Sequence, residues 1–405
     1  MALTVALAAA SGVWASGSRA RAVEVPIAGG SARTHYPALY SVACPAPGSC
    51  TAVGSVYESA DAREIAVAAA ERRGSWHPAT ALGLALSCPP GGPCVAFGTY
   101  TSAAGAQLMA STRRHGRWSA ASRIALPAAA GVGRRTPANF GGVFCTGPGD
   151  CVATLVYGAG VSSRAMIVTE TGGAWRSATK IALPPPDARR DAVLRSVACA
   201  AAGDCVAVGQ FSSGAADVDS PILATEQGGR WGHAVAIAPP AGTSASSALG
   251  GAYLRAVACP AAGSCTAIGS YRDARYNSRP FAITQTRGAW GPATPLPLPS
   301  DALPPARGFG IAEAYALACT HPEDCAVVGT YTVRSRDSEA LVETEIAGRW
   351  SASTPVTLPP GAVAASSGLQ TVLLGVATDG SGYDAVGYYH VHHGGTAAMA
   401  LHFTP

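Results

Sequence analysis

Charge is scarce in this sequence and lysine is nearly absent. Charged residues make up 13% of the 405 residues, and Lys180 is the one lysine among the 28 Lys and Arg. The basic residues are scattered rather than striped and the net charge is only +4, which argues against a dedicated nucleic-acid surface. No apolar run reaches about 18 residues without Gly, Pro or a charge, so no membrane-spanning helix is predicted.

Catalytic and cofactor motifs are also missing. The sequence has no G-x-S-x-G elbow, no H-E-x-x-H pair, no Walker loop and no Rossmann fingerprint. Asp379–Asp384 ("DGSGYD") resembles part of a calcium loop but has no acidic residue at the closing position. We therefore predict no catalytic residue, no metal ligand and no cofactor. Two carboxylates across a pore mouth would suit a glycosidase, and the candidates by position are Glu58, Asp61, Asp217, Asp219, Asp273 and Asp337.

Apolar and turn-forming residues dominate what is present. Hydrophobic residues make up 48% of the chain, which also has 48 Gly and 30 Pro. Such a chain buries a large core but is interrupted by turns throughout, which excludes disorder and a long-helix protein.

The twelve cysteines form six pairs, and the two members of each pair are six positions apart. The pairs are Cys44/Cys50, Cys88/Cys94, Cys145/Cys151, Cys199/Cys205, Cys259/Cys265 and Cys319/Cys325. A zinc site would need two such pairs converging at closer spacing, so six separate pairs fit local disulfides better. Six disulfides predict an oxidising compartment, and so a secreted or cell-surface protein.

The cysteine pairs mark an internal repeat of seven units. Six units share a template such as "RSVACAAAGDCVAVGQF", and a seventh, "LGVATDGSGYDAVGYY", has Ala377 and Tyr383 where the cysteines stand. Consecutive first cysteines are 44 to 60 residues apart. A G-x-W sequence follows each first cysteine by 30 to 32 residues, at Trp76, Trp118, Trp175, Trp231, Trp290 and Trp350.

Each unit predicts four short antiparallel strands. The first ends at the first cysteine, as in Leu254–Cys259, and the second begins at the second cysteine, as in Cys265–Tyr271. The third is an apolar segment such as Phe281–Thr286 or Ala165–Thr169, and the fourth starts at the tryptophan. We therefore predict an all-β, seven-bladed β-propeller, with an open solenoid as the alternative. The blades are expected to start near residues 38, 82, 140, 193, 253, 313 and 371.

The last unit lacks its fourth strand, because the chain stops 28 residues after Ala377. The N-terminal segment can supply it, through Gly12-Val13-Trp14 in the G-x-W position or through "AVEVPI", since a closed ring leaves no unpaired edge. Residues 1–22 also resemble a signal peptide that lacks a basic start. We expect residues 1–11 to be the remnant of a signal peptide and residues 12–405 to form a single propeller.

The template S-x-x-C-x5-C-x-A-V-G, present in Ser41–Gly54 and Ser196–Gly209, resembles that of the secreted seven-bladed β-propellers common in actinobacteria. The likeness covers nearly the whole chain, and the excess of arginine over lysine fits a high-GC source. The turn at Thr171–Trp175 is similar to the Asp-box turn of sialidase- and sortilin-like propellers, but the Ser and Asp of that motif are missing. The resemblance implies an architecture, and this fold hosts many functions.

The two rims of the predicted propeller differ. Turns between strands one and two and between three and four are short and uniform. Connections between strands two and three and between blades vary in length and carry most of the charge. Because binding residues concentrate in variable loops on a rigid scaffold, we expect a ligand at this second rim, the long-loop rim.

Two neighbouring loops of that rim hold the densest candidates. Arginines there suit bidentate capture of a carboxylate or sulfate, and a tyrosine suits stacking on a sugar. The predicted ligand-binding residues are Arg272, Asp273, Arg275, Tyr276, Arg279, Arg334, Arg336 and Asp337. Solvated salt bridges are the alternative interpretation of this cluster.

These patterns predict a secreted or cell-surface, non-enzymatic binding or adhesion module that recognises a glycan or a protein through the long-loop rim. A polysaccharide-active hydrolase or lyase and a structural envelope protein are the alternatives. The expected partner is an extracellular glycan or protein and not nucleic acid, and the chain is expected to be a monomer.

The disulfide assignment predicts a mass difference. The unreduced protein is expected to be about twelve hydrogens lighter than the reduced protein, two for each of the six pairs. Reduction is expected to lower the thermal midpoint without abolishing the fold, because so short a loop contributes about 2 kcal/mol while burial between blades contributes far more. Mass spectrometry with thiol labelling checks this, and free thiols in the native protein would contradict it.

Overall fold

We describe the protein from a computed structural model of the 405-residue chain. The structure describes residues 20–27, 35–58, 63–79, 85–89, 91–102, 105–114, 117–125, 138–157, 163–176, 178–184, 191–213, 218–245, 250–304, 310–335, 337–351, 355–363, 371–392 and 395–405. These residues form strands and no helix. Trp14, one candidate for the closing strand, lies outside them.

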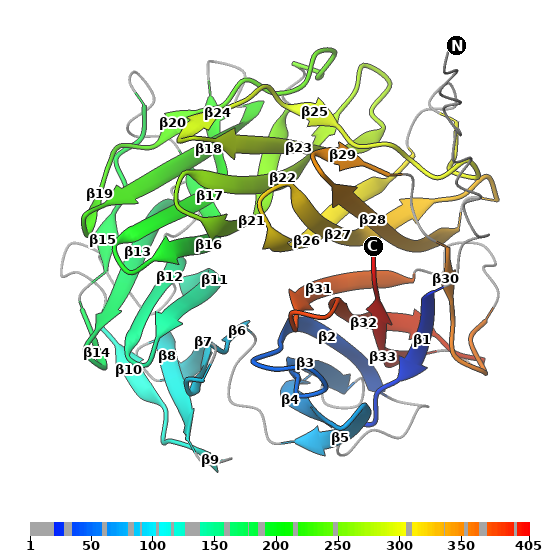
Figure 1. Ribbon diagram of the computed structural model, residues 1–405, viewed down its shortest axis with the longest axis horizontal. Helices are drawn as coiled ribbons and strands as arrows, with labels where there is room; N and C mark the ends of the chain where they lie inside the picture. Colours follow the sequence, from blue (N-terminus) through cyan, green and yellow to red (C-terminus); the bar gives the residue numbers. More distant parts are fainter. Residues whose placement is uncertain are drawn as a thin grey trace, which may run out of the picture.

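Seven antiparallel sheets stand in a ring around a central axis (Figure 1), which confirms the predicted propeller. In blades 1 to 6 the strands run from the axis outward in chain order, and the first strand of every blade is the inner strand. The inner strands of blades 1 to 7 are β2 (His35–Ala43), β6 (Ala85–Ser87), β11 (Ala138–Gly147), β16 (Ala192–Ala201), β21 (Ala252–Ala261), β26 (Ala312–His321) and β31 (Val372–Thr378).

The second and third strands of each blade are long and continuous. The second strands are β3 (Thr51–Glu58), β7 (Cys94–Ser102), β12 (Asp150–Tyr157), β17 (Asp204–Ser213), β22 (Ser264–Arg272), β27 (Asp324–Thr332) and β32 (Tyr383–His390). The third strands are β4 (Arg63–Arg72), β8 (Gly105–Arg114), β13 (Arg164–Thr171), β18 (Val218–Gln227), β23 (Ser278–Thr286), β28 (Ser338–Ile346) and β33 (Thr396–Phe403).

The fourth strand differs from the expectation, because in four blades it is split into two short pieces that both pair with the third strand. In blade 5 the split contains Pro292, which has no backbone N–H for the ladder. The outer pieces of blades 1 to 6 are β5 (Ser75–Ala79), β9 (Arg117–Trp118) with β10 (Ser122–Ile124), β14 (Ala174–Trp175) with β15 (Thr179–Lys180), β19 (Arg230–Trp231) with β20 (Val235–Ala236), β24 (Ala289–Trp290) with β25 (Thr294–Pro295), and β29 (Arg349–Trp350).

The N-terminal strand closes the ring, as predicted. β1 (Ala20–Glu24) pairs antiparallel with β33, with Ala22 opposite Leu401, and so completes blade 7. β30 (Val356–Thr357), from the segment that follows blade 6, pairs in parallel with the outer edge of β1. Figure 1 shows β1 lying between β33 and β30. The last blade therefore holds strands from both ends of the chain.

The six predicted disulfides are all present, each joining the inner and second strands of blades 1 to 6 at the same turn. In blade 4, for example, Cys199 lies directly opposite Cys205 in the ladder. No described cysteine is free.

Cys325 is the most deeply buried of these cysteines, with 0% of its surface exposed. It lies on β27 directly opposite Cys319, to which it is bonded, and packs in an apolar cluster with Ile268 and Val327. The pairing with Cys319 is as predicted. Cys325 is buried in the core, whereas Arg275 and Arg334, which the sequence also singled out, are exposed. Cys325 is therefore a core residue that fastens two strands, and it cannot meet a ligand.

Blade 7 corrects one detail of the sequence alignment. Its ladder places Thr378 opposite Tyr383, the relation that the two cysteines have in the other blades. Ala377 lies opposite Asp384 instead, so its assignment to the first-cysteine position is wrong by one residue. The reason is that this hairpin turn is one residue shorter than the others.

A β-bulge recurs at one level of the inner strands β2, β11, β16, β21, β26 and β31. In β21 the ladder steps from Leu254 to Ala256, so Arg255 has no partner on β22. A bulge bends the strand and re-aims the unpaired side chain. The bulge residues other than those of blade 3 are Tyr40, Arg195, Arg255, Tyr315 and Leu374.

The glycine of the A-V-G template exists because of this bulge. A Cβ on Gly269 would overlap the carbonyl oxygen of Tyr253, which the bulge brings against the second strand. The same overlap occurs for Gly54 with Ala38, Gly209 with Val193, Gly329 with Glu313 and Gly387 with Val372. Only glycine leaves room for that carbonyl group.

In blade 3 the glycine that makes room for a neighbouring carbonyl group lies on the inner strand instead of the second strand. Leu155 stands where the other blades have the glycine, and it pairs with Phe140 of the inner strand. The bulge here contains Gly141 and Gly142, and a Cβ on Gly141 would overlap the Leu194 carbonyl oxygen of blade 4. The glycine has therefore moved to the strand that the next blade contacts.

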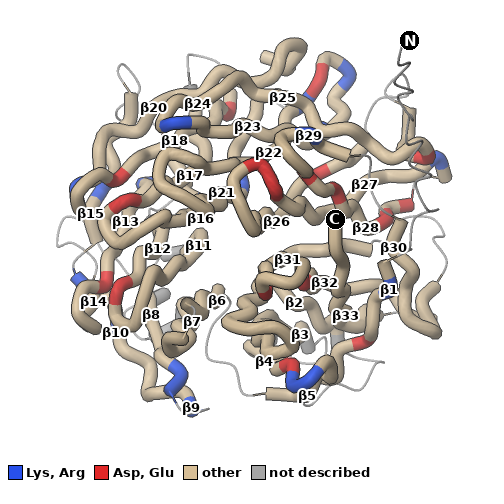
Figure 2. Tube along the Cα trace, in the orientation of Figure 1, with Lys and Arg blue, Asp and Glu red and all other residues tan. Residues whose placement is uncertain are grey.

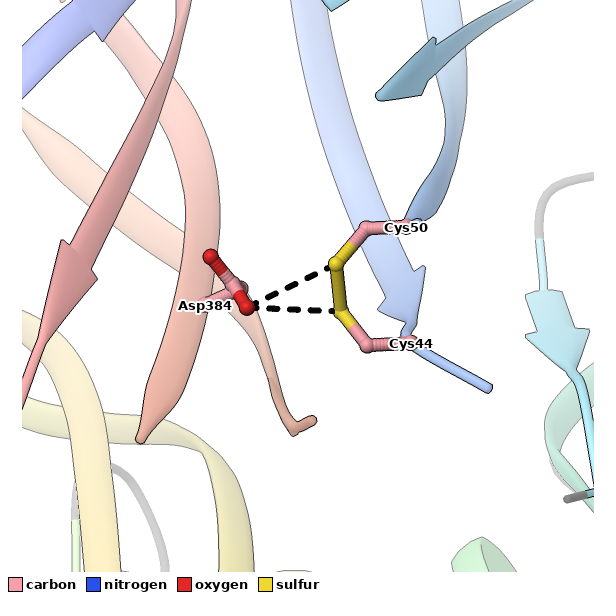
Figure 3. A group of neighbouring side chains, drawn as sticks. All are labelled: Cys44, Cys50 and Asp384. Carbon is pink, nitrogen blue, oxygen red and sulfur yellow. Dashed lines mark hydrogen bonds between the residues drawn. A yellow bond between two sulfur atoms is a disulfide. The ribbon is translucent and has the colours of Figure 1, made fainter. Parts of the chain in front are cut away.

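The seam between blades 7 and 1 buries a carboxyl group against a disulfide (Figure 3). Asp384, 5% exposed, has its Oδ2 atom 3.6 Å and 3.5 Å from the sulfurs of Cys44 and Cys50. Sulfurs bonded to each other carry no hydrogen and cannot donate, so the carboxyl oxygen receives no hydrogen bond from the disulfide that it contacts. Burial raises the pKa of Asp384, although His402, 3.1 Å away, opposes that shift.

A second carboxyl group is buried in blade 6 without any partner among the described residues. Glu343 of β28 is fully buried, and neither of its carboxyl oxygens has a hydrogen-bond partner in the described part of the chain. The equivalent positions of blades 3, 4 and 5 hold Val168, Ala224 and Ile283. Burial raises the pKa of Glu343 well above its usual value, so its carboxyl is protonated in the folded state.

The glycine contact predicts a specific loss of stability. Gly269→Ala is expected to lower the free energy of unfolding by about 1–3 kcal/mol, because the new Cβ forces apart two paired strands. Gly147→Ala is the control, since no described atom lies within 4 Å of a Cβ there. Urea unfolding of both variants measures the difference, and a Gly269→Ala variant as stable as the parent would contradict this account of the template.

The buried Glu343 predicts a gain of stability. Glu343→Val is expected to raise the free energy of unfolding near pH 7 by about 2–3 kcal/mol, because the parent must protonate a carboxyl that is ionised when unfolded. Glu343 stabilises the fold least at high pH, since the contribution present below its unfolded pKa is lost as pH rises toward the folded value.

Urea unfolding at several pH values tests this. The gap between Glu343→Val and the parent should narrow as pH falls toward about 4. A variant that is less stable than the parent, or a gap independent of pH, would show that Glu343 has a partner.

Candidate functional site

The inner strands of all seven blades surround a cavity of about 670 Å³ on the ring axis. Its lining runs from the bulges, at Tyr40 for example, to the disulfide hairpins, at Cys44 and Cys319. Small-molecule sites commonly have this size. Among the described residues that line it, the charged ones are Arg195 and Arg255, and none is a carboxylate.

The disulfides contribute to this wall through their first cysteines only. Cys44, Cys88, Cys145, Cys259 and Cys319 line the cavity. Their partners on the second strands do not, and Cys325, which is fully buried behind Cys319, is the extreme case. The disulfides therefore support the site mechanically and add no reactive group to it.

The bulge residues give this cavity its chemistry. Tyr40, Arg195, Arg255, Tyr315 and Leu374 all line it, and Gly141 and Gly142 do so in blade 3. The residue of blade 2 at this level, Leu84, lies outside the described part. Positive charge is therefore confined to blades 4 and 5, while the wall at blade 3 is bare backbone.

Each arginine reaches across a seam to a tyrosine of the next blade. The guanidinium carbon of Arg195 lies 5.2 Å from the ring centre of Tyr253, and that of Arg255 lies 4.4 Å from the ring centre of Tyr315. Such cation–π contacts contribute about 0.5–2 kcal/mol each and hold the planar groups in place. The two pairs form one continuous polar surface over blades 4, 5 and 6.

This surface lies at the long-loop end of the cavity. Tyr253 is the second residue of β21, and its neighbour Ala252 pairs with Tyr271, the last residue but one of β22 before the long loop. Glu313 has the same place at the start of β26. The arginines of the cavity therefore lie at the long-loop rim, which is the rim where the sequence predicted a binding site.

Hydrogen bonds fix the groups behind the arginines. Arg195 donates its Nε–H to Gln210 at 2.7 Å, and Gln210 donates in turn to Asp219 at 3.1 Å. Glu313 accepts from the Tyr315 hydroxyl at 3.0 Å and from Ser278 of blade 5 at 3.1 Å. The carboxylates are thus occupied by protein donors.

Burial determines the protonation states on this surface. It raises the pKa of Tyr253 and of Tyr315, and nearby Glu313 raises both further, so the two phenols are neutral at physiological pH. Burial lowers the pKa of the Arg195 guanidinium, and the positive charge of Arg255 lowers it further. Two like charges are thus held close together in a partly buried place.

The first predicted loop is organised by one of its own carboxylates. Asp273 accepts backbone N–H groups of Arg275 at 2.8 Å and of Asn277 at 3.0 Å, and the Asn277 side-chain amide at 2.8 Å. Partial burial raises the pKa of Asp273, but these hydrogen bonds outweigh it and leave the pKa below its usual value. Asp273 therefore shapes the loop from within.

Most other predicted residues of that loop are also engaged. Arg279 lies 3.8 Å from Asp273, and Arg272 donates to the Tyr276 carbonyl oxygen at 3.3 Å. Tyr276 has a positive φ of 61° at the tip of the turn. Arg275 is exposed.

The second predicted loop contains one buried aspartate and one exposed arginine. Asp337 is 1% exposed and accepts a hydrogen bond from Ser335 at 2.7 Å. Arg334 is exposed and donates to the Ser300 carbonyl oxygen at 3.2 Å. Arg336 lies outside the described residues, as do Asp61 and Asp217.

In the hairpin that resembles a calcium loop, Asp379–Asp384, the carboxylate of Asp379 stabilises the turn itself. Asp379 accepts three hydrogen bonds from Ser381 and Gly382 through one oxygen, and Asp384 accepts from or donates to His402. Asp379, Asp384 and His402 do bring ligand atoms within 4.8 Å of one another. Their polar groups are nevertheless engaged with the turn and with each other, so this cluster is not assigned as a metal site.

The sequence patterns did not single out the bulge residues that line the cavity, although a signal for them was present. Arg195, Arg255 and Tyr315 each stand four positions before a first cysteine, and Tyr40 does too. A charged or phenolic side chain at a fixed place in an otherwise apolar inner strand is unusual for a core position. The signal could be interpreted only after the bulge showed where these side chains point.

Figure 2 shows the charged residues spread around the ring. Among the described residues, no helix is long and apolar enough to span a membrane.

Comparison with known proteins supports the fold alone. No protein-family model and no curated protein matches the sequence. Among solved structures, an ulvan lyase of a new polysaccharide lyase family matches with a TM-score of 0.55 and 10% identity, covering 91% of this chain and 94% of that one.

Two further structures are similar at lower scores. A Dyadobacter fermentans protein of unknown function has a TM-score of 0.48 and 9% identity over 95% of this chain and 98% of its own. A Hadza microbial sialidase has a TM-score of 0.45 and 11% identity over 86% and 73%.

Proposed function

We propose that the protein is a secreted binding module that holds an acidic carbohydrate at the long-loop end of its central cavity. The observation that carries the proposal is the adjacent pair Arg195 and Arg255 in a cavity whose described lining contains no carboxylate. Two nearby guanidinium groups repel each other, and the lowered pKa of Arg195 reflects this together with burial. A bound carboxylate or sulfate removes that repulsion.

The arrangement suits a sugar that bears an anionic group. A guanidinium binds a carboxylate or sulfate through two parallel N–H donors, which fixes the orientation of the ligand. Tyr253 and Tyr315 hold the two guanidinium planes and offer flat ring surface beside them. The exposed Arg275 and Arg334 on the same rim extend the positive surface for a longer chain.

The disulfides support secretion. Six disulfides fit an oxidising extracellular environment, since thiols are kept reduced in the cytosol. The similarity to ulvan lyase supports the fold alone. The proposed ligand rests on the residues of the cavity.

A polysaccharide lyase is the second candidate, favoured by the contact of Arg255 with Tyr315. Arginine would neutralise a uronate carboxylate, and a neutral tyrosine would protonate the leaving oxygen. However, the raised pKa values of both tyrosines disfavour either phenol as the base that removes the ring proton. Binding without turnover therefore fits the protonation states better.

Binding of acidic polysaccharides tests the proposal. Calorimetric titration with polygalacturonate, chondroitin sulfate and heparin, against neutral dextran, is expected to show binding of at least one acidic chain and a loss of affinity with added salt. Arg195→Gln and Arg255→Gln are each expected to weaken it about tenfold or more, because each removes a charged bidentate donor.

The matched control is Arg349→Gln, which removes the same charge from an exposed turn of blade 6. It should bind as the parent does. Equal binding by the parent and both cavity variants would overturn the proposal. Ultraviolet absorbance from an unsaturated uronate product would show instead that the protein is a lyase.

A further inference from the structure

The tryptophans of the repeat each face a polar partner across the third and fourth strands. The directly opposite pairs are Glu71/Trp76, Arg113/Trp118, Glu170/Trp175, Glu226/Trp231, Gln285/Trp290 and Glu345/Trp350. Residues directly opposite in an antiparallel ladder lie on one face of the sheet. An indole N–H donor and, in five of the six pairs, an oxygen acceptor therefore stand together at the seam between blades.

In blade 4 this pair borders a groove. The groove lies between blades 3 and 4 and has a volume of about 410 Å³. Blade 4 contributes Glu226 and Trp231. The polar residues from blade 3 include two carboxylates and an arginine and are Asp150, Thr169, Glu170, Arg176 and Thr179. Cys205 and the turn residues Gly203 and Gly229 also line it, which places it at the disulfide rim, away from the long-loop rim.

Three polar groups of this groove have no hydrogen-bond partner among the described residues. Glu226 is 3% exposed and Glu170 is 6% exposed, and the Oε2 atom of each is buried without a donor. The indole N–H of Trp231 is also buried and has no acceptor. Each buried group without a partner costs about 1–3 kcal/mol, so the three together indicate that a ligand completes the groove.

These groups restrict the chemistry of that ligand. A cation would engage the carboxylates of Glu170 and Glu226 and leave the indole N–H without an acceptor, and an anion would do the reverse. Several hydroxyl groups on one ligand serve all three, because some donate to the carboxylates and another accepts from the indole. A sugar ring offers such hydroxyls and an apolar face for the tryptophan beside them.

We propose that the groove between blades 3 and 4 is a binding site for a neutral sugar ring. In this site Glu226 accepts a hydrogen bond from one ring hydroxyl and Trp231 donates to its neighbour. Thr169, Thr179 and Arg176 supply polar groups from the opposite wall. The site is independent of the arginine pair in the central cavity and takes a ligand without charge.

The next seam repeats part of the arrangement. A groove of about 400 Å³ between blades 4 and 5 is bordered by Gln285, whose amide donates to the Gly288 carbonyl oxygen at 3.1 Å. Gln285 stands opposite Trp290, whose buried indole N–H has no acceptor in the described part of the chain. Trp290 does not line this groove, so the proposed site is the one between blades 3 and 4.

The experiment uses the intact protein and simple glycosides. The methyl glycosides of glucose, galactose, mannose, fucose and N-acetylglucosamine are titrated by saturation-transfer NMR and tryptophan fluorescence. At least one is expected to bind. Trp231→Phe, which keeps the ring but removes the N–H, should weaken that binding about tenfold, and Glu226→Gln several-fold.

Glu226→Gln is a variant compatible with the fold, because blade 5 has Gln285 at the same place. Trp175→Phe is the matched control, since Trp175 packs against Phe97 and does not line this groove. Arg195→Gln should leave glycoside binding unchanged, which separates this site from the central cavity.

Three outcomes would overturn the inference. The first is no binding of any glycoside at millimolar concentration. The second is an equal loss in Trp175→Phe and Trp231→Phe, which would indicate a general packing effect. The third is a crystal structure, grown with the best-binding glycoside, in which ordered water alone occupies the groove.

Discussion

The contact on which the blades depend is a backbone carbonyl group packed against a glycine. In blade 5 the Tyr253 carbonyl oxygen fills the space that a side chain at Gly269 would occupy. That contact lets the inner strand bulge, and the bulge turns Arg255 toward the axis. The same geometry recurs around the ring, so one steric constraint sets both the bend of the inner strands and the side chains that line the central cavity.

The scaffold and its chemistry are separable because of this arrangement. The bulge position is unpaired in the ladder, so its side chain is free to vary without disturbing strand pairing. Tyrosine, arginine and leucine all occur there, while glycine holds the opposite position in most blades. The cavity wall that this repeat forms thus carries arginines at blades 4 and 5 and glycines without side chains at blade 3.

Polar groups placed at the seams are where the fold departs from simple apolar packing. Asp384 is buried against the disulfide of the neighbouring blade, and Glu343 is buried with no partner among the described residues. Glu226 and Trp231 face a groove with polar atoms that no described residue matches. Because the strand cores pack tightly, the seams between blades are the places where buried polar groups are accommodated.

The sequence by itself determined the number of blades, the six disulfides, the strand order and the closure of the ring by an N-terminal strand. These follow from local patterns, because cysteine spacing, glycine turns and strand alternation act over a few residues. Only the tertiary structure decided which polar residues meet. Asp273 looked like a ligand residue in the sequence, yet it shapes its own loop, while Arg195 and Arg255, 60 residues apart, form one surface. The bulges and the angle between neighbouring blades bring Arg195 and Arg255 together, and neither can be inferred from the sequence of one repeat.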